Sequence, residues 1–505
     1  MDTRSASLYP VAAGCHSTPD AGDAACRCGC VGAGRCRAAK SLRSTDRMQL
    51  CKPLSPCRSD LQRSRPGVVF VVWRSCCGLS FSGCLAETVT IDTGPDMTIS
   101  EIPAVPDVGA LLIAAEHLSQ ELALAAAAAD RHRLLPFDAM HALRRQRLGA
   151  LRVPQAYGGA GATWDAVAKL FILLAQGDAS VAQAFLSHYV FVERLRLMGS
   201  HDQCLRLLPL AAGGTLFGGA AAERGGRFRG ELATRLTADG AGYRLNGTKH
   251  YSTGALFADV LKIRALDERD RMISVLIPAD RAGIERIDDW NGMGQRCTAS
   301  GTTTLSNVAV AADEIMPMAV WTSQRHHTGA AAQIIHCAID AGIALAAVRD
   351  ATSWIRSGSL DKSDPHTLHT LGRMAARAHA AEAIVLSAAQ TLENAAHLRF
   401  SGPAHLKGQA DVNAEAAALD ASLATARAKI ISTQAALEVT QKLFDIGGIA
   451  DQEPGNLPQH RQHDHLDRHW RNARTHTTHD PVAYKCRAIG DYLLNGNAPP
   501  LTFSY

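Results

Sequence analysis

The chain has 505 residues, a formal net charge of +4 and an apolar fraction that is ordinary for a globular protein. This length allows several domains or one large domain with a sizeable core, and no apolar run indicates a membrane span. Residues 1–96 carry 12 Lys and Arg against 8 Asp and Glu, which leaves 40 against 40 from Met97 onward. The neutral body therefore lacks the global field expected of a protein that binds nucleic acid or a membrane surface.

Residues 1–96 also differ from the rest in their cysteine content. They hold ten of the 14 cysteines, but those in "CRCGCVGAGRC" alternate and have no second pair at zinc-binding spacing. The stretch "RSRPGVVFVVWRSCCGLSFSGCLA" resembles a signal sequence. However, it starts far into the chain, and Arg74 interrupts its apolar part. Because this composition fits no core, we expect a disordered extension or a mis-assigned start, with Met97 opening the functional protein.

Residues 97–214 are predicted to form an N-terminal helical domain. Apolar residues recur at three- and four-residue steps over 107–135, and a second helix is expected to begin near Pro136. The glycine-rich "YGGAGATW" is typical of a turn. Residues 164–199 then predict two more helices, the first of which ends near Gly177.

The period changes near Thr215, and residues 215–318 predict a small β domain. Short runs such as "DVLKIRAL", "RMISVLIPA" and "GTTTLSNVAV" are separated by Gly, Asn and Asp. "RLTADGAGYRLNG" predicts a hairpin around Asp239 and Gly240. About a hundred residues is a typical size for one independent sheet unit.

Helical spacing returns in residues 325–505. The pattern predicts long helices over 333–357, 366–397 and 411–443, and a last helix from Pro481 to Asn495 that Gly496 stops. This resembles an antiparallel bundle. The expected fold class is therefore mainly α, with a small β domain between an N-terminal helical domain and a C-terminal four-helix bundle.

The segment "DRHWRNARTHTTHDP", residues 467–481, concentrates groups that can carry chemistry. His476 and His479 are three residues apart and share one face if the segment is helical, and Asn472 and His469 continue that face. Imidazole holds or delivers a proton near neutral pH. Asp480 before Pro481 has the pattern of a helix N-cap, which is the alternative to a catalytic carboxylate.

Four strings, taken together and in order, resemble the acyl-CoA dehydrogenase superfamily. They are "RVPQAYGGAGATW", "RLNGTKHYSTGALFAD", "GMGQRCTASGTTTLSNVAV" and "FDIGGI", and the likeness covers nearly all of residues 110–496. Within the superfamily, "KHYSTGALFAD" and "LDRHWRNARTHTTHDP" most resemble the reduced-flavin monooxygenases. That branch includes the dibenzothiophene desulfurisation monooxygenases and the sulfur-acquisition oxidoreductases.

The resemblance implies a set of site residues. The catalytic candidates are His188, His476, His479 and Asp480, and the flavin-binding candidates are Tyr251, Ser252, Thr253, Arg296, Gly447, Gly448 and Arg474. A lone His on an apolar helix, as at His188, is also the pattern of a satisfied core residue. No metal ligand is expected.

Departures from the dehydrogenase pattern favour the monooxygenase branch. Asp480 stands where many dehydrogenases keep a catalytic Glu, and its shorter arm beside Pro481 is poorly suited to reach a substrate α-proton. In the dehydrogenases one loop serves both flavin and coenzyme A. The corresponding segment here keeps Glu223, but the residues beside Glu223 differ from the dehydrogenase pattern. Arg356 is retained without the Phe-Gly that supports the FAD dinucleotide. These losses favour FMN over FAD.

The sequence therefore predicts a cytoplasmic two-component monooxygenase that acts with O2 on a small apolar molecule, sulfur compounds among the candidates. Reduced FMN is expected from a separate flavin reductase, since no nicotinamide fingerprint follows a predicted strand. The resemblance implies a homodimer or homotetramer, without a nucleic acid or membrane partner.

Three other functions remain open. The first is an FAD-dependent acyl-CoA dehydrogenase. The second is a metalloprotein using "HRQHDHLDRH" and "HTTHD", although no known ligand spacing is present. The third is a catalytically inactive relative kept for binding.

Overall fold

The computed structural model describes residues 70–71, 88–89 and 105–505, except for 228–229, 320–322, 358–360, 402–411, 448–464 and 503–504. The chain divides into two compact units, Met1–Met97 and Thr98–Tyr505. In the first unit, β1 (Phe70–Val71) pairs antiparallel with β2 (Thr88–Val89). The cysteine cluster and the disorder predicted for residues 1–96 lie outside the described residues.

Helices occupy the first part of the second unit. They are α1 (Val108–His132), α2 (Phe137–Arg145), α3 (Trp164–Gly177), α4 (Ala179–Met198) and α5 (His201–Gly213). The carboxylate of Asp107 caps α1 by accepting a hydrogen bond from Ala110 N at 2.9 Å. The helix α3 ends at Gly177 as predicted, where a Cβ would lie 2.7 Å from the carbonyl oxygen of Ser119. The helix α5 was not predicted.

An eight-stranded sheet follows. Its strands are β3 (Phe217–Ala220), β4 (Arg235–Asp239), β5 (Gly242–Lys249), β6 (Val260–Leu266), β7 (Met272–Pro278), β8 (Ile284–Ile287), β9 (Thr302–Val310) and β10 (Ile315–Pro317). The order is β10-β7-β6-β4-β5-β9-β8, and β3 pairs parallel with β6. The predicted hairpin is confirmed, because Asp239 pairs with Gly242 and Gly240 takes a φ of 59°. The short strands β8 and β10 were not predicted.

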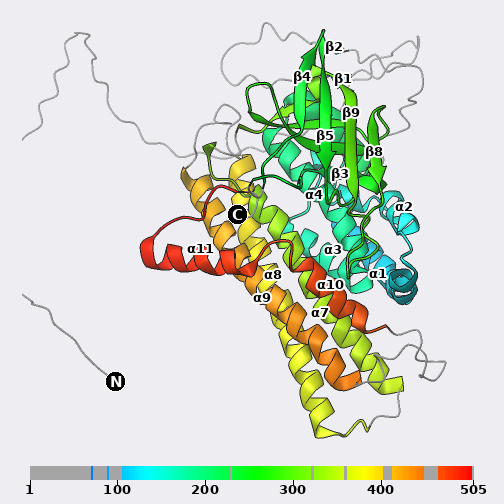
Figure 1. Cartoon of the computed structure of the whole chain (residues 1–505). Helices are drawn as coiled ribbons and strands as arrows, with labels where there is room; N and C mark the ends of the chain where they lie inside the picture. Colours follow the sequence, from blue (N-terminus) through cyan, green and yellow to red (C-terminus); the bar gives the residue numbers. More distant parts are fainter. Residues whose placement is uncertain are drawn as a thin grey trace, which may run out of the picture. The chain divides into compact units, whose positions relative to one another are not determined.

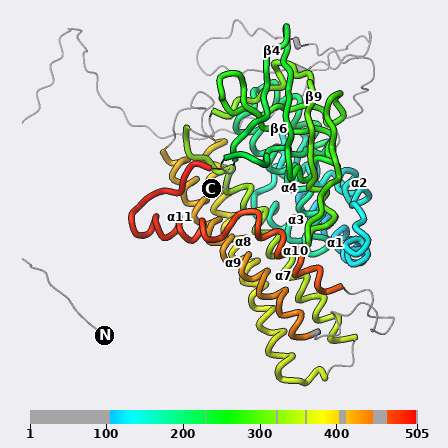
Figure 2. The backbone as a smooth tube through the Cα atoms, viewed as in Figure 1, coloured from blue at the N-terminus to red at the C-terminus, as the bar shows by residue number. Residues whose placement is uncertain are grey.

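Long helices form the last part of the unit. They are α7 (Thr328–Ser357), α8 (Pro365–Ser401), α9 (Val412–Gly447), α10 (Asp467–His476) and α11 (Val482–Asn495). Figure 1 shows α7, α8 and α9 lying side by side, with α10 beside α7, and the tube in Figure 2 follows the same path. Gly496 ends α11 in the left-handed conformation, as predicted. The expected fold class is confirmed.

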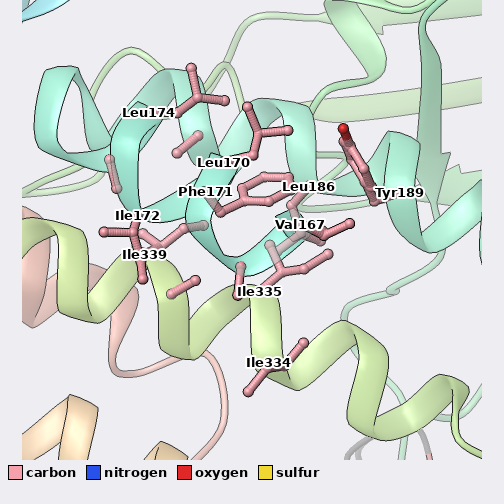
Figure 3. Close-up of a cluster of buried hydrophobic side chains, with 14 of the residues drawn as sticks. Val167, Leu170, Phe171, Ile172, Leu174, Leu186, Tyr189, Ile334, Ile335 and Ile339 are labelled. Atoms are coloured by element: carbon pink, nitrogen blue, oxygen red, sulfur yellow. The ribbon is translucent and has the colours of Figure 1, made fainter. Parts of the chain in front are cut away.

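The core joins the N-terminal helices to this bundle. Side chains of α3 and α4, among them Phe171 and Tyr189, pack against Ile335 of α7 (Figure 3). A Cβ on Gly342 of α7 would lie 2.6 Å from Ala175 of α3, so the two helices approach closely. Helices and sheet form one compact unit, and the predicted domain boundaries at 214 and 318 stay predictions.

Two described helices are long and apolar enough to cross a membrane, which corrects the expectation that no such run exists. They are α1 and α7. In α7, 83% of the most apolar window is buried inside the molecule, against α3, α8 and α9. A core helix passes the same test of length and composition, so neither helix by itself assigns a membrane span.

Starting the chain at Met97 is expected to leave the thermal unfolding midpoint unchanged, because the unit from Thr98 holds its own hydrophobic cores. Parallel melts of the full and shortened chains measure this. A shortened chain that is insoluble, or that melts well below the full one, would show that the first unit stabilises the second.

Candidate active site

A cavity of about 1540 Å³ opens where the sheet, α4, α7 and the segment after α10 meet. It exceeds the roughly 300–1,000 Å³ of a typical small-ligand pocket, so a cofactor and a substrate fit together. Its wall includes Gln183, Leu186, Ser187, Val190, Arg194, Gly219, Ala221, Ala222, Glu223, Tyr251, Thr253, Lys262, Arg264, Gln333, His336, Thr475, His476, His479 and Asp480.

The segment 467–476 is a helix, α10, held by its polar residues. Arg468 and His469 both contact Asp350 of α7, at 2.6 and 2.8 Å. Asn472 accepts a hydrogen bond from a backbone N–H of the loop before β9. His469, Asn472 and His476 are all buried at helical spacing, so the expected face exists and is not solvated.

A buried carboxylate stands behind His476. Asp340 of α7 has no side-chain exposure, and its Oδ1 lies 2.6 Å from His476 Nδ1. Its Oδ2 accepts hydrogen bonds from Lys429 Nζ at 2.9 Å and Thr433 Oγ1 at 3.0 Å. Burial alone would raise the pKa of Asp340, but Lys429 and His476 outweigh it and hold the pKa below its ordinary value. The charged carboxylate only accepts, so His476 Nδ1 donates to it.

His476 connects this carboxylate to two further imidazoles. His476 Nε2 lies 3.0 Å from His336 Nδ1, and His336 stacks on His479 with ring centroids 4.1 Å apart. Burial lowers the pKa of His476, and burial with the neighbouring imidazoles lowers that of His336 well below its ordinary value. Both rings are therefore neutral at pH 7, and His476 Nε2 accepts from His336 Nδ1–H.

Asp340, His476, His336 and His479 thus run from a buried carboxylate to the cavity wall. We call these four residues the histidine relay. The sequence predicted the two histidines after Arg474, and the structure adds His336 and Asp340 from another helix.

Asp480 is not the helix cap that its sequence context favoured. Pro481 occupies the N-cap position of α11, without a side-chain hydrogen bond. The Asp480 carboxylate is buried, and its Oδ2 lies 2.9 Å from the Nζ of Lys485, whose side chain is 1% exposed. A buried ammonium one turn into the helix therefore draws the carboxylate inward, away from the free backbone N–H groups.

Tyr251, Ser252 and Thr253 follow β5, and two of them line the cavity. Tyr251 has a φ of 57°, uncommon for a bulky residue, and the Arg224 guanidinium lies 4.6 Å from its ring centroid. Thr253 Oγ1 and Ser300 Oγ are hydrogen-bonded at 2.7 Å. Ser252 is buried behind them, and its Oγ has no hydrogen-bond partner within the described part of the chain.

Two carboxamide oxygens in the cavity wall are also unsatisfied. The Oε1 atoms of Gln183 and Gln333 are buried and find no hydrogen-bond partner among the residues that the structure describes. Buried polar atoms are nearly always paired, so these acceptors point to a ligand that carries N–H or O–H groups. A flavin ring offers an N–H between two carbonyl groups, and a ribityl chain offers hydroxyls. The donor and acceptor set therefore fits a flavin.

Two other predicted flavin contacts, Arg296 and Arg474, do not line this cavity. Arg296 is half-buried and Arg474 is exposed. Gly447 is the last residue of α9, and Gly448 lies outside the described residues. Their contact with flavin stays a prediction.

His188 lies in the core between α4 and the sheet, not at the cavity. Its Nε2 lies 3.0 Å from Gly149 O, and its Nδ1 accepts from Phe217 N at 3.2 Å. The ring stacks on Phe185 at a centroid distance of 5.4 Å. Burial lowers the pKa of His188 to about 4. Both ring nitrogens are satisfied by backbone, which favours the core alternative over a substrate-facing role.

Sequence reasoning missed His336 in the cavity wall and the charged groups behind the wall. His336 and Asp340 are four residues apart in the otherwise apolar "IIHCAIDAGIAL", and buried polar groups one turn apart were a usable signal. Lys429 and Lys485 have no such marker, since lysine is ordinary on an amphipathic helix. The described residues contain no group of three or more His, Cys, Asp or Glu arranged for a metal, and the first half of "HRQHDHLDRH" lies outside them.

Comparison with known protein families gives two matches. Residues 113–215 match the acyl-CoA dehydrogenase N-terminal domain, and residues 334–483 match the acyl-CoA dehydrogenase C-terminal domain.

Two relatives extend the likeness over most of the chain. It is 32% identical over 379 residues to the dibenzothiophene monooxygenase of Mycolicibacterium goodii, covering 71% of this chain and 87% of that protein. It is 30% identical over 410 residues to the probable FMNH2-dependent monooxygenase SfnC of Pseudomonas putida, covering 78% and 97%. The crystal structure of TdsC from Paenibacillus sp. A11-2 with FMN and indole matches with a TM-score of 0.69 at 28% identity, covering 78% and 99%.

Replacing His188 with Gln is expected to reduce the acid sensitivity of folding. The folded pKa of about 4 lies below the unfolded value of 6.5, so protonation of the unfolded chain costs stability as pH falls from 6.5 to 4. The variant should lose about 3 kcal/mol of this pH dependence. Urea unfolding between pH 8 and pH 4.5 measures it, with the exposed His369→Gln as control. An unchanged slope, or lost turnover in a fully folded variant, would contradict the core assignment.

Replacing Asp480 with Asn is expected to destabilise the fold by about 3–5 kcal/mol, because it leaves a buried ammonium without its carboxylate. The double variant Asp480→Asn with Lys485→Met should recover most of this loss. Denaturant unfolding of the single and double variants measures both. A helix cap would behave differently, since Asn caps about as well as Asp, and an unharmed single variant would restore that interpretation.

Proposed function

The chain belongs to the acyl-CoA dehydrogenase family, in its branch of FMNH2-dependent monooxygenases, and on that basis we propose how it acts. It is a flavin-dependent monooxygenase that uses reduced FMN and O2 to oxygenate a small, largely apolar molecule. Sulfur compounds are the first candidates, because one relative is named for dibenzothiophene. The apolar lining from Leu186, Val190, Ala221 and Ala222 supports an apolar substrate.

One observation carries the proposal, namely the histidine relay at the cavity wall. A dehydrogenase needs a carboxylate that is free to take a substrate proton. Here Asp480, at the corresponding position, is already compensated by Lys485 at 2.9 Å. Imidazoles from two helices stand beside it instead, and imidazole suits an oxygen-activating flavin, which needs a proton donor.

Bound reduced FMN would supply the electrons that activate O2. For this chain's residues we propose that Tyr251, Thr253, Gln183 and Gln333 hold the ring. Asp340 fixes the His476 tautomer, so that His476 Nε2 accepts the His336 Nδ1–H and orients the ring on which His479 stacks. His479, exposed at the cavity, delivers its own proton to the reacting oxygen and is reprotonated from solvent.

The remaining partners follow from the same proposal. Reduced FMN comes from a separate flavin reductase, and the enzyme works in the cytoplasm as a homodimer or homotetramer, without a nucleic acid or membrane partner. The relative named as FMNH2-dependent supports the external supply of reduced flavin.

The test is an anaerobic titration with reduced FMN followed by a pulse of oxygenated buffer. A monooxygenase gives a transient absorbance distinct from the reduced and oxidised flavin, and oxygenated product when an organosulfur compound such as dibenzothiophene is present. Bleaching of bound FAD by an acyl-CoA, with no such transient, would replace the proposal by a dehydrogenase. A chain that binds neither flavin would be a non-catalytic relative.

Replacing His479 with Phe is expected to keep the ring stack on His336 while removing the proton carrier. Flavin affinity should stay within about twofold, whereas oxygenated product should fall by about 10²-fold or more and hydrogen peroxide release should rise. The matched control is His369→Phe, the same change at an exposed histidine of α8. Wild-type product yield without extra peroxide would remove His479 from the mechanism.

A further inference from the structure

Two cations, buried Lys262 and half-buried Arg264, stand on the cavity-facing side of β6. Side chains alternate along a strand, and Leu261, Ile263 and Ala265 enter the core of the sheet. Lys262 and Arg264 therefore occupy the opposite face, and both line the cavity. Buried positions on a strand are usually occupied by apolar or neutral residues, and Lys and Arg are rarely buried there without a partner. The two charges therefore require an explanation.

A third cation comes from α4. Arg194 is 6% exposed and also lines the cavity, and the positive charges of Arg194 and Arg264 act on Lys262. Burial and these like charges lower the pKa of Lys262 well below its ordinary value. A buried ammonium beside two guanidinium groups is unfavourable unless an acceptor joins it.

Lys262 is the member that lacks a protein partner. It is 4% exposed, and among the described residues only burial and the cations Arg194 and Arg264 act on it, with no carboxylate or other acceptor for its Nζ. The carboxylate of Glu223, in the same cavity, is engaged elsewhere. It accepts from Lys249 Nζ, from Thr234 Oγ1 at 2.7 Å and from the backbone N–H of Ala233. Lys262 therefore has an open position for an external acceptor.

The position of these cations in the cavity restricts the ligand further. Lys262 pairs with Gly219 of β3, and Ala222, three residues on, is bridged to His250 beside Tyr251. At about 3.3 Å per residue, Lys262 lies roughly 10 Å along β3 from Ala222, whereas Arg264 lies closer to it. Ala221 and Ala222 leave the intervening wall small and apolar. The geometry suits a molecule with an anionic head and an apolar or extended body.

We propose that Arg194, Lys262 and Arg264 form a binding subsite for an oxyanion group, such as a sulfonate, sulfinate, carboxylate or phosphate. Planar guanidinium groups and an ammonium are the usual protein ligands of such groups. The subsite itself does not depend on the reaction. Its assignment to the head group of an oxygenated substrate rests on the proposed function, and the phosphate of the flavin is the other source of the same chemistry.

The first experiment replaces Lys262 with Met, which keeps the volume and removes the charge. Thermal unfolding is followed with methanesulfonate or inorganic phosphate, against chloride at matched ionic strength. The wild type should gain several degrees with the oxyanion. The variant should lose this gain and, without added oxyanion, should melt higher than the wild type, because a buried charge without a partner is gone.

Arg487→Gln is the matched control, because it removes an exposed positive charge from the same cavity while leaving the three cations in place. It should keep the oxyanion response. If both variants lose the oxyanion-induced rise in melting temperature equally, the oxyanion responds to the overall positive charge of the cavity. If Lys262→Met keeps the rise, the oxyanion binds elsewhere. Either result overturns the subsite.

The second experiment identifies the source of the oxyanion. Affinities for FMN and for riboflavin are measured on both proteins. If Lys262→Met leaves the ratio of these affinities unchanged while competition by alkanesulfonates is lost, the subsite takes the substrate. If the ratio collapses towards one, the subsite holds the flavin phosphate. Both outcomes keep the oxyanion subsite. If the variant changes neither the ratio of affinities nor the competition by alkanesulfonates, the subsite is overturned. The oxygen pulse without substrate tests the monooxygenase separately.

Discussion

One buried carboxylate, Asp340, joins the parts on which the active site depends. It is an α7 residue, yet it binds Lys429 of α9 and His476 of α10. Such a buried ion pair adds little net stability, but removing one of its charged partners costs about 3–5 kcal/mol. The three helices are therefore held in one register. The same contact that fixes α10 on the bundle also sets the tautomer of His476. A substitution of Asp340 would therefore change both the packing of α10 and the protonation of His476.

The relation to the acyl-CoA dehydrogenases shows how one fold supports two chemistries. The carboxylate position is kept at Asp480, but Lys485 compensates its charge inside the protein. In the proposed mechanism, proton transfer falls to imidazoles, one of them from α7, which the dehydrogenase pattern in the sequence does not indicate. The same scaffold of helices and sheet can therefore carry a different set of proton donors.

The sequence predicted most of the fold because its periodic signals were strong. The ends of α3 at Gly177 and of α11 near Gly496 were readable from glycine, and the hairpin at Gly240 from its turn residues. The short strands β8 and β10 were missed, since three or four residues show no measurable alternation. At the site, the resemblance indicated Tyr251, Thr253, His476 and His479, which all line the cavity. Asp340 and Lys485 were not, because their importance lies in contacts between distant segments that no local pattern contains.

The cavity wall takes residues from Gln183 in α4 to Asp480 beyond α10, almost three hundred positions apart along the chain. Contacts of such long sequence separation form late, after the loop-closure entropy of the intervening chain has been overcome. During synthesis the first helices and the sheet emerge well before α10. A growing chain that ends before α10 therefore holds His336 but neither His476 nor His479. The residues proposed to move protons come together only after the last part of the chain has been made.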